Sequence, residues 1–486
     1  MNVLAYDFGA SSGRLMLGKF ENNKITLKEI HRFNNEPVYM NGGLFWDLPR
    51  LFYEIKQGLL KAKSEQFESI GIDTWGVDYG LIARNGDIIG NPYHYRDIRT
   101  ENIIQLFGDV IDEKELYFSS GIQNMAFNTV FQLFAMKENQ KWMYNEADKF
   151  LMLPDLFGYL LTGEKYCECS VASTTQLLNP YTKEWNAELI EKSGLKKEMF
   201  PKLVSPGTKI GRLKKEICEE LGIDEKLLIA VAGHDTASAV VAVPACEKDF
   251  SYISCGTWSL FGTELDKPCI NEKSAQTNIT NEVGYNNTTR FLKNISGLWM
   301  LQETRRQFKR EGKEYSYADM EKLARDAEPF KCFIDPDALI FAQPGNQPER
   351  IREFCRKTEQ YVPQSDGEII RCIYESLAMK YRYTFEKLKE CTEKDFKTIH
   401  MVGGGTKDNF LCEMTADATG VKVLAGPVEA TSLGNVAVQL IAMGKIKDMD
   451  EARKIIRNSF EVKEYIPEQT DTWDKAYQKF VHNLLK

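Results

Sequence analysis

The sequence predicts an α/β protein of two halves, each opened by two strands that a short polar turn connects. A chain of 486 residues is too long for one ordinary hydrophobic core, so two domains are expected. Residues 3–20 and 250–262 both show the pattern of strand, glycine-containing turn and strand. We place the domain boundary after residue 245, which gives domains over 1–245 and 246–486. No long linker separates them, so we expect the halves to pack together over a cleft.

The other elements follow from apolar spacing and turn residues. Apolar side chains recur at helical spacing over residues 46–64 and predict an amphipathic helix. The remaining predictions are a strand at 25–33, a strand with a polar centre at 70–82, a turn at Asn85-Gly86, a strand at 399–402, a helix at 409–419, a short strand at 421–424 and a helix at 429–443. Residues 100–200 are more helical and irregular, which indicates an insertion on the first half.

The charge balance restricts the ligands that the chain is expected to bind. Lysine and arginine number 62 against 70 aspartates and glutamates, so the net charge is −8. An acidic surface argues against nucleic acid and anionic membranes as partners, so any anionic ligand has to be held by local groups. No apolar run is long enough to cross a bilayer, and the first residues lack the pattern of a secretory signal. We therefore expect a cytoplasmic protein, either a monomer or a small homo-oligomer.

The eleven cysteines are scattered, with no CxxC pair and no zinc-type spacing, so reduced thiols are expected. Cys355 and Cys372 flank a loop-like stretch and are candidates for lying close together. A disulfide between them is one interpretation. Two small buried hydrophobic side chains are the interpretation that we favour.

The segment 232–239 contains the strongest candidate for a catalytic group. It sets Asp235 between His234 and Thr236, next to a glycine and ahead of a run of small residues. A carboxylate in this setting can take a proton from a substrate hydroxyl, while the small residues let a ligand approach the backbone. The alternative is a turn in which Asp235 caps the next helix. Glycine-containing loops on either side of the segment favour the catalytic interpretation.

The loop at 7–14 carries groups that suit a phosphate: backbone at Gly9 and Gly13, hydroxyls at Ser11 and Ser12, and a positive charge at Arg14. Asp7 at the end of the preceding strand is a candidate to hold Mg²⁺ through water. The loop lacks the spacing of a P-loop, and an ordinary hairpin with a glycine turn is the alternative.

Two later loops also carry groups that suit a phosphate. Gly256-Thr257 offers backbone amides and a hydroxyl, although most such turns are only turns. Gly403, Gly404 and Gly405 follow an apolar strand, and three successive glycines are costly unless the backbone has to approach something closely. Three such loops and a cleft carboxylate together predict phosphoryl transfer from a nucleotide, which depends mainly on positioning and electrostatics.

These residues resemble the FGGY carbohydrate kinases, which belong to the actin-like ATPase superfamily. The most discriminating segments are Asp73-Thr-Trp-Gly76 and His234-Asp-Thr236. The full set of matching segments is 7–14, 29–34, 71–78, 95–100, 233–239, 255–260, 278–282, 293–299 and 426–434. Cys255 departs from the pattern, because a serine is common at that place, but this leaves the backbone of the loop intact.

The resemblance implies two actin-like (ribonuclease H-like) domains flanking an active-site cleft, with a ketose on the N-terminal side and ATP on the C-terminal side. Asp235 would be the base that deprotonates the O1 hydroxyl of the ketose, and Asp7 would help to place Mg²⁺. The implied substrate-binding residues are Gly76, His234, Asp235, Thr236 and Asn294. The implied ATP-binding residues are Ala10, Ser11, Ser12, Gly13, Arg14, Thr257, Gln302 and Gly404. A non-catalytic actin-like protein that binds ATP is the alternative from another class.

Overall fold

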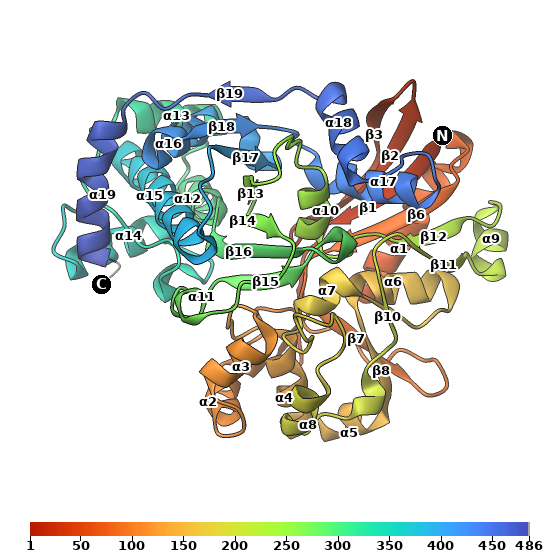
Figure 1. Cartoon of the computed structure of the whole chain (residues 1–486). Coiled ribbons are helices and arrows are strands. Elements are labelled where there is room, and N and C mark those ends of the chain that lie inside the picture. Colours follow the sequence, from red (N-terminus) through yellow and green to blue (C-terminus); the bar gives the residue numbers. More distant parts are fainter. Residues whose placement is uncertain (485–486) are drawn as a thin grey trace. The chain divides into compact units, whose positions relative to one another are not determined.

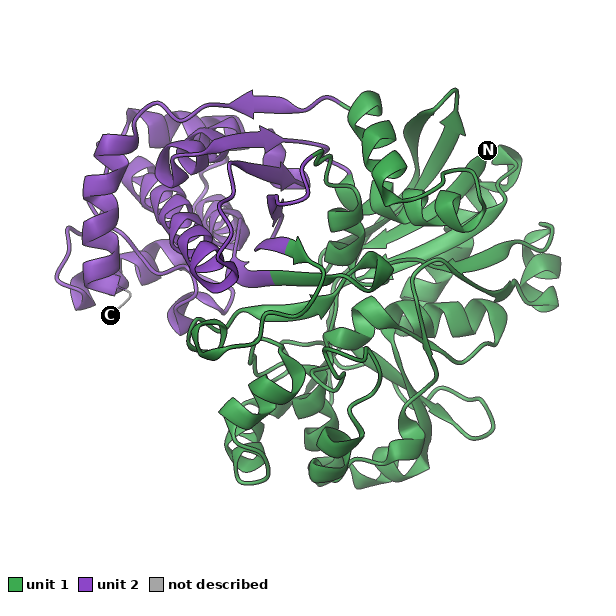
Figure 2. Ribbon diagram, in the orientation of Figure 1, with its two compact units in different colours: residues 1–246, 264–291, 430–460 green, residues 247–263, 292–429, 461–486 purple. Residues whose placement is uncertain are grey.

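The computed structural model describes residues 1–484 and divides the chain into two compact units (Figure 1 and Figure 2). Unit 1, green in Figure 2, consists of residues 1–246, 264–291 and 430–460. Unit 2, purple in Figure 2, consists of residues 247–263, 292–429 and 461–486. Each unit combines a β-sheet with helices, as predicted for an α/β protein.

Unit 1 is built on a six-stranded sheet whose strands lie in the order β11-β12-β6-β1-β2-β3. Their bounds are Thr208–Arg212, Leu227–Ala230, Ser69–Thr74, Asn2–Phe8, Ser12–Glu21 and Lys24–Asn34. The predicted opening hairpin is confirmed, since β1 runs antiparallel to β2 and sets Asp7 opposite Arg14. Strands β6 and β12 run parallel to β1 and to each other, so the carboxyl ends of all three meet at one edge of the sheet.

Helices cover both faces of this sheet. On one face α1 (Leu48–Lys61) and α6 (Leu153–Thr162) form a core with the side chains of Leu4, Tyr6 and Phe8. The predicted helix over 46–64 is therefore confirmed, and Asp47 caps its first turn. On the other face α17 (Ala430–Ala442) packs on β1 and β6, and α10 (Asp235–Val241) packs on α17. Because β1 alternates its side chains between the two faces, Asp7 points toward α17 and away from the apolar core.

The single strand predicted over 70–82 is wrong. The chain forms β6, leaves the sheet at Trp75, and then forms β7 (Tyr79–Ala83), which pairs with β8 (Ala147–Met152) in a separate two-stranded sheet. The break has a backbone cause, since Val77 has a φ of +66° and cannot continue a strand.

The predicted helical insertion contains short helices around a core of its own. Between residues 100 and 200 these are α2 (Ile103–Gly108), α3 (Glu113–Ser120), α4 (Thr129–Asn139), α5 (Lys141–Glu146), α7 (Cys169–Ser173) and α8 (Ala187–Lys192), besides α6. Val130, Leu133 and Phe134 of α4 are among the buried residues of this second core. The insertion therefore has the apolar interior that holds its irregular loops in place.

Unit 2 repeats the strand arrangement of unit 1. Its central strands are β13 (Ser251–Cys255), β14 (Trp258–Leu265) and β17 (Thr398–Val402), where β13 pairs antiparallel with β14 and parallel with β17. Strands β18 (Lys422–Ala425) and β19 (Lys463–Tyr465) extend the sheet. The predicted likeness between the two halves is thus confirmed at the level of strand pairing.

Helices surround the sheet of unit 2, and α15 (Asp366–Thr392) is the longest of those described. It begins at a capping box formed by Ser365 and Glu368 and packs against α13 (Tyr317–Asp326) and α16 (Asn409–Thr419). Helix α16 has the bounds that the sequence predicts, because Asp408 caps its start and Gly420 ends it with a φ of +68°. The other helices are α12 (Trp299–Arg310), α14 (Gln347–Lys357) and α19 (Thr470–Leu484).

All eleven cysteines are free thiols. Cys355 and Cys372 are buried, which confirms the interpretation as small hydrophobic side chains. Their sulfur atoms lie within 4.8 Å of each other and of the Cys332 sulfur. The sequence does not predict this group, because its members come from three separate segments. No described helix is long and apolar enough to cross a membrane.

Candidate active site

The carboxyl edge of the unit 1 sheet brings several of the predicted residues together. Asp7 lies near the end of β1, Asp73 lies beside it in β6, and the Thr74 amide donates to the Gly233 carbonyl at 2.9 Å. The strand that contains β12 therefore continues alongside β6 as far as His234, and helix α10 starts at Asp235. In parallel sheets this edge is where ligands bind, because the loops that follow the strands gather there.

Asp235 occupies the first turn of α10 with its side chain still 29% exposed. The Thr236 hydroxyl donates to its Oδ1 at 3.1 Å, and His234 Nε2 lies 3.5 Å from the same oxygen. Burial raises the pKa of Asp235; a positive charge on His234 opposes the shift and Asp7 adds to it. The alternative in which Asp235 caps the helix is wrong, since His234 occupies the cap position. Asp235 is thus an accessible carboxylate with more basic character than an ordinary aspartate.

His234 faces two charged residues that were not predicted to belong to the site. Its Nδ1 atom lies 3.1 Å from Glu282 Oε2 and accepts a hydrogen bond from Arg290 Nη2 at 3.2 Å. Burial alone would raise the pKa of Glu282, but the Arg290 charge and the contact with His234 outweigh it and lower the pKa to about 2. Glu282 lies in the strand β15 (Thr280–Val283), and Arg290 lies near the start of β16 (Thr289–Ser296). An ionised carboxylate therefore stands behind the histidine.

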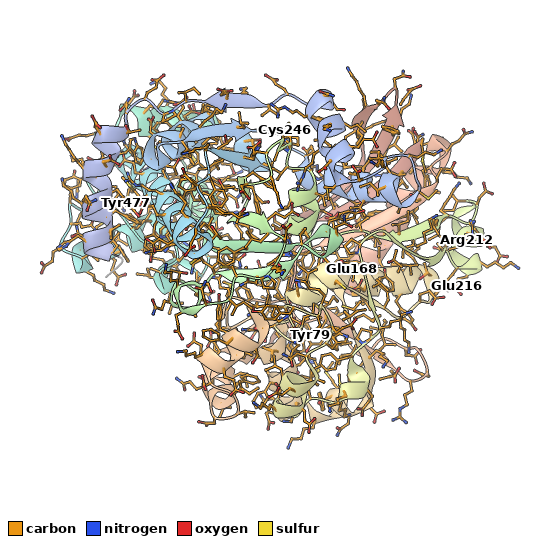
Figure 3. The ribbon with its side chains drawn as sticks, viewed as in Figure 1. Tyr79, Glu168, Arg212, Glu216, Cys246 and Tyr477 are labelled. Carbon is orange, nitrogen blue, oxygen red and sulfur yellow. The ribbon has the colours of Figure 1, made fainter. Side chains whose placement is uncertain are left out.

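The backbone of the turn before Asp235 is held by a second buried carboxylate. Glu168, labelled in Figure 3, lies at the end of the short strand β9 (Cys167–Glu168), directly before α7. Its side chain accepts from the Gly233 amide at 2.9 Å and from the amide and hydroxyl of Ser170. The Ser170 hydroxyl in turn accepts from the His234 amide at 3.2 Å. These bonds fix the main chain from which His234 and Asp235 project.

Gly76 lies in the strained turn between β6 and β7. A Cβ atom at this position would lie 2.8 Å from the Thr174 methyl group, so the packing requires a glycine. The neighbouring residue Val77 is held at its positive φ because its amide donates to the Thr174 hydroxyl at 2.9 Å. Strained backbone of this kind persists only where the surroundings enforce it, and it is frequent at ligand sites.

Asp78 closes the same turn by accepting hydrogen bonds from the Trp46 and Trp75 ring nitrogens at 2.7 and 2.9 Å. Burial raises the pKa of Asp78 to about 6, although these donors oppose the shift. The two indole rings lie with their centroids 4.1 Å apart. The turn that carries Gly76 is therefore fixed by buried polar and aromatic contacts on both sides.

The loop at 9–14 is only partly available to a nucleotide. The Phe33 ring covers Gly13 so closely that a Cβ atom there would clash, so this glycine serves packing within unit 1. Arg14 pairs with Asp7, with its Nη2 atom 2.8 Å from Oδ2, and the Ser432 hydroxyl donates to the same oxygen at 2.8 Å. Ala10 and Ser12 are half-buried and Ser11 is exposed, which makes the loop tip the accessible part.

In unit 2 the ends of β13 and β17 lie side by side and bring two predicted loops together. Thr257 follows β13, and its hydroxyl lies 3.4 Å from Gln302 Oε1 of α12. After β17, Gly403 and Gly405 pack against Cys255, whereas a Cβ atom at Gly404 would meet nothing within 4 Å. Thr257, Gln302 and Gly404 thus lie at one edge of this sheet, with open space at Gly404.

Asn294 lies half-buried on β16 in unit 2, whereas the other predicted substrate-binding residues belong to unit 1.

The carboxylates at the carboxyl edge of the unit 1 sheet are oxygen ligands of the kind that Mg²⁺ takes. Asp73 Oδ1 is buried without a hydrogen-bond partner, and burial together with Asp7 raises the pKa of Asp73 well above its usual range. Among the His, Cys, Asp and Glu side chains of the described residues, only one group of three has its metal-ligating atoms all within 4.8 Å of one another. Its members are Cys332, Cys355 and Cys372. Asp7, Asp73 and Asp235 therefore do not form a direct three-carboxylate site. Mg²⁺ commonly keeps several waters and takes one or two carboxylates together with phosphates.

Glu168, Glu282 and Arg290 could not be assigned from the sequence. Their distance along the chain from His234 gives no sign of contact. The one signal was the segment 278–282, which ends at Glu282 and is among the segments that resemble the family, although the resemblance gave Glu282 no role.

The sequence matches two adjacent domains of one protein family. Residues 2–242 match the N-terminal domain, and residues 251–443 the C-terminal domain, of the FGGY family of carbohydrate kinases.

Proteins named rhamnulokinase are similar to this chain along its whole length. The protein from Bacteroides thetaiotaomicron is 42% identical and covers 99% of this chain and 98% of its own length. The protein from Enterococcus faecalis is 43% identical and covers 98% and 97%. The protein from Bacillus subtilis is 40% identical and covers 100% and 99%.

Solved structures share the fold at low sequence identity. The ligand-bound xylulose kinase from Lactobacillus acidophilus has a TM-score of 0.84 at 18% identity, covering 99% of this chain and 97% of that one. The Plasmodium falciparum glycerol kinase with ADP has a TM-score of 0.79 at 15% identity, covering 100% and 98%. These likenesses show the fold alone, which is the two-domain α/β fold of the actin-like ATPases, as predicted.

Proposed function

The chain belongs to the FGGY family of carbohydrate kinases, and we propose that it phosphorylates L-rhamnulose on O1. The products are L-rhamnulose 1-phosphate and ADP, and the reaction belongs to the breakdown of L-rhamnose. Similarity over the full length to several proteins named rhamnulokinase supports this choice of sugar. The observation that carries the chemistry is the accessible carboxylate of Asp235, fixed between Thr236 and His234.

In the proposed mechanism Asp235 accepts the proton of the O1 hydroxyl as that oxygen attacks the γ-phosphorus of ATP. A new P–O bond forms to O1, the bond to the β–γ bridging oxygen breaks, and its electron pair leaves on ADP. The raised pKa of Asp235 suits this role, because a more basic carboxylate takes the proton more readily. Thr236 and His234 orient the carboxylate, and with Gly76 and Asn294 they contact the ketose.

The nucleotide is proposed to bind through the loop tip Ala10 to Ser12 and through Thr257, Gln302 and Gly404. The open space at Gly404 supports this assignment, since it lets a ligand approach the backbone. Gly13 and Arg14 contribute indirectly: Gly13 by packing under Phe33, and Arg14 by holding Asp7 in place. Mg²⁺ would neutralise charge on the phosphates, with Asp7 holding it through water.

We also propose that the division after residue 245 separates a sugar-binding from a nucleotide-binding domain. The two family matches, which end at 242 and begin at 251, support it. We place the protein in the cytoplasm, because eleven free thiols suit a reducing compartment. A monomer or small homo-oligomer remains the expected assembly.

A substrate panel tests the choice of sugar. ADP release is measured with Mg-ATP and L-rhamnulose, L-fuculose, L-xylulose, D-xylulose, L-ribulose or glycerol. We expect the highest kcat/KM for L-rhamnulose. A higher value for another ketose would assign the enzyme to that sugar, and slow hydrolysis of ATP independent of sugar would instead indicate an actin-like ATP-binding protein.

A further inference from the structure

Behind the proposed base lies a buried group of charges that the proposed mechanism does not use. Arg290 is fully buried, and its Nη2 atom lies 2.9 Å from Glu282 Oε2. Both atoms lie within 3.2 Å of His234 Nδ1. Buried charges are costly unless they are paired, and a pair that contacts a site residue affects that residue directly. The ion pair therefore acts on His234.

The chemistry of the three groups determines which atom of His234 carries a proton. Arg290 can only donate, and Glu282, with its pKa lowered to about 2, can only accept at neutral pH. The hydrogen bond at Nδ1 comes from Arg290 Nη2 at 3.2 Å, so Nδ1 is the acceptor and its lone pair faces the guanidinium. The ring N–H group then lies at Nε2, which faces Asp235 at 3.5 Å from Oδ1. Glu282 Oε2 lies 2.9 Å from the same Arg290 Nη2 atom and holds the guanidinium in place.

We propose that Glu282 is a positioning residue that acts on Asp235 through Arg290 and His234. It holds the Arg290 guanidinium where Nη2 donates to His234 Nδ1, and this hydrogen bond directs the Nε2–H group toward the base. This inference rests on the proposed role of Asp235 as the base. The contacts from Glu282 through Arg290 and His234 to Asp235 fix the orientation of the group that faces the base.

Other charged residues lie near Asp235 and His234, and the substitutions proposed below leave them unchanged. Asp7 and Asp73 lie at the same sheet edge as Asp235, and Arg14 is paired with Asp7. Helix α17 packs on α10 and contains no titratable residue. At the far end of α10, Arg453 of α18 (Met449–Ser459) donates to the Val240 carbonyl and pairs with Glu264. Of the charged partners, only Glu282 and Arg290 reach the Nδ1 side of His234 in the described residues.

The first test is Glu282→Gln, which keeps the shape of the side chain and removes its charge. We expect kcat for the ketose to fall about 10- to 100-fold while KM changes less than about threefold, since the ketose still finds its contacts. Glu272→Gln is the matched control, because Glu272 is an exposed carboxylate in the same segment and pairs only with Lys114 at the surface. Glu282→Asp, which keeps the charge, should recover part of the lost kcat.

A double-mutant cycle completes the test, because a residue that acts through His234 has no effect once His234 is gone. In a His234→Gln background, the further change Glu282→Gln should alter kcat less than about twofold. If the Glu282→Gln protein does not fold, a double variant with Glu282→Gln and Arg290→Gln takes its place. It removes both charges together and allows the same comparison. Equal losses in both backgrounds, or a normal kcat in the Glu282→Gln protein, would overturn the inference. Absence of kinase activity in the wild-type protein would instead overturn the proposed function.

Discussion

At the scale of the residue, the three glycines that follow β17 have different reasons to be glycine. Gly403 has a φ of +89°, and a Cβ atom there would lie 3.0 Å from the Cys255 carbonyl oxygen. At Gly405 a Cβ atom would lie 2.1 Å from the Cys255 sulfur. Gly404 has neither constraint, since a Cβ atom there would meet nothing within 4 Å. Packing within unit 2 thus explains two of the glycines but not Gly404, which we propose contacts the nucleotide.

The substitutions Gly404→Ala and Gly405→Ala separate these reasons. Gly404→Ala should leave thermal stability within about 0.5 kcal/mol of wild type and raise the KM for ATP several-fold. Gly405→Ala should destabilise by about 1–3 kcal/mol through overpacking against Cys255. Thermal unfolding and ATP titration of initial rates measure both effects. An unchanged KM for ATP in Gly404→Ala would remove this residue from the proposed nucleotide site.

At the scale of the element, the turn before α10 depends on parts of the chain that are far away in sequence. Thr74 of β6 and Glu168 at the end of β9 bond the Gly233 main chain from two sides. The sequence singles out this turn, because the small residues and the carboxylate form a local pattern. It gives no sign of Glu168, since an isolated acid in Cys167-Glu-Cys169 carries no periodic signal.

Loss of the Glu168 side chain should therefore weaken the whole element. Glu168→Ala leaves the Gly233 amide and the Ser170 donors buried without an acceptor. We expect a loss of about 2–4 kcal/mol in the free energy of unfolding, measured by urea denaturation. Glu164→Ala is the control, because Glu164 is exposed and precedes the same strand. If both variants unfold at the same urea concentration, Glu168 does not hold the turn.

At the scale of the whole molecule, local patterns in the sequence predict the elements within each unit. They do not predict which segments of the chain make up that unit. Both opening hairpins and the helix 409–419 follow from short-range apolar and glycine patterns, and the structure confirms them. The return of residues 430–460 to unit 1 was not predicted, because α17 lies on β1 and β6 through contacts that span the length of the chain. For the same reason Asp235 could be predicted from a local pattern, whereas the contacts of Glu282 and Arg290 with His234 could not.

The cysteines give a prediction for the whole chain. Reaction with a thiol reagent in denaturant, without reductant, should count eleven thiols. In the native protein Cys246 should react first, since it is exposed and nine of the others are buried. A count of nine in denaturant would mean a disulfide, for which Cys355 and Cys372 are the nearest candidates.

The most direct test of the central claim is the rate of ADP formation from Mg-ATP and L-rhamnulose by wild type and Asp235→Asn side by side. The variant keeps the shape of the side chain, so thermal unfolding should show a folded protein. We expect turnover by the wild type and a kcat about 10²–10⁴-fold lower in Asp235→Asn, because asparagine cannot take the O1 proton. A folded Asp235→Asn protein with nearly normal turnover would contradict the assignment of Asp235 as the base.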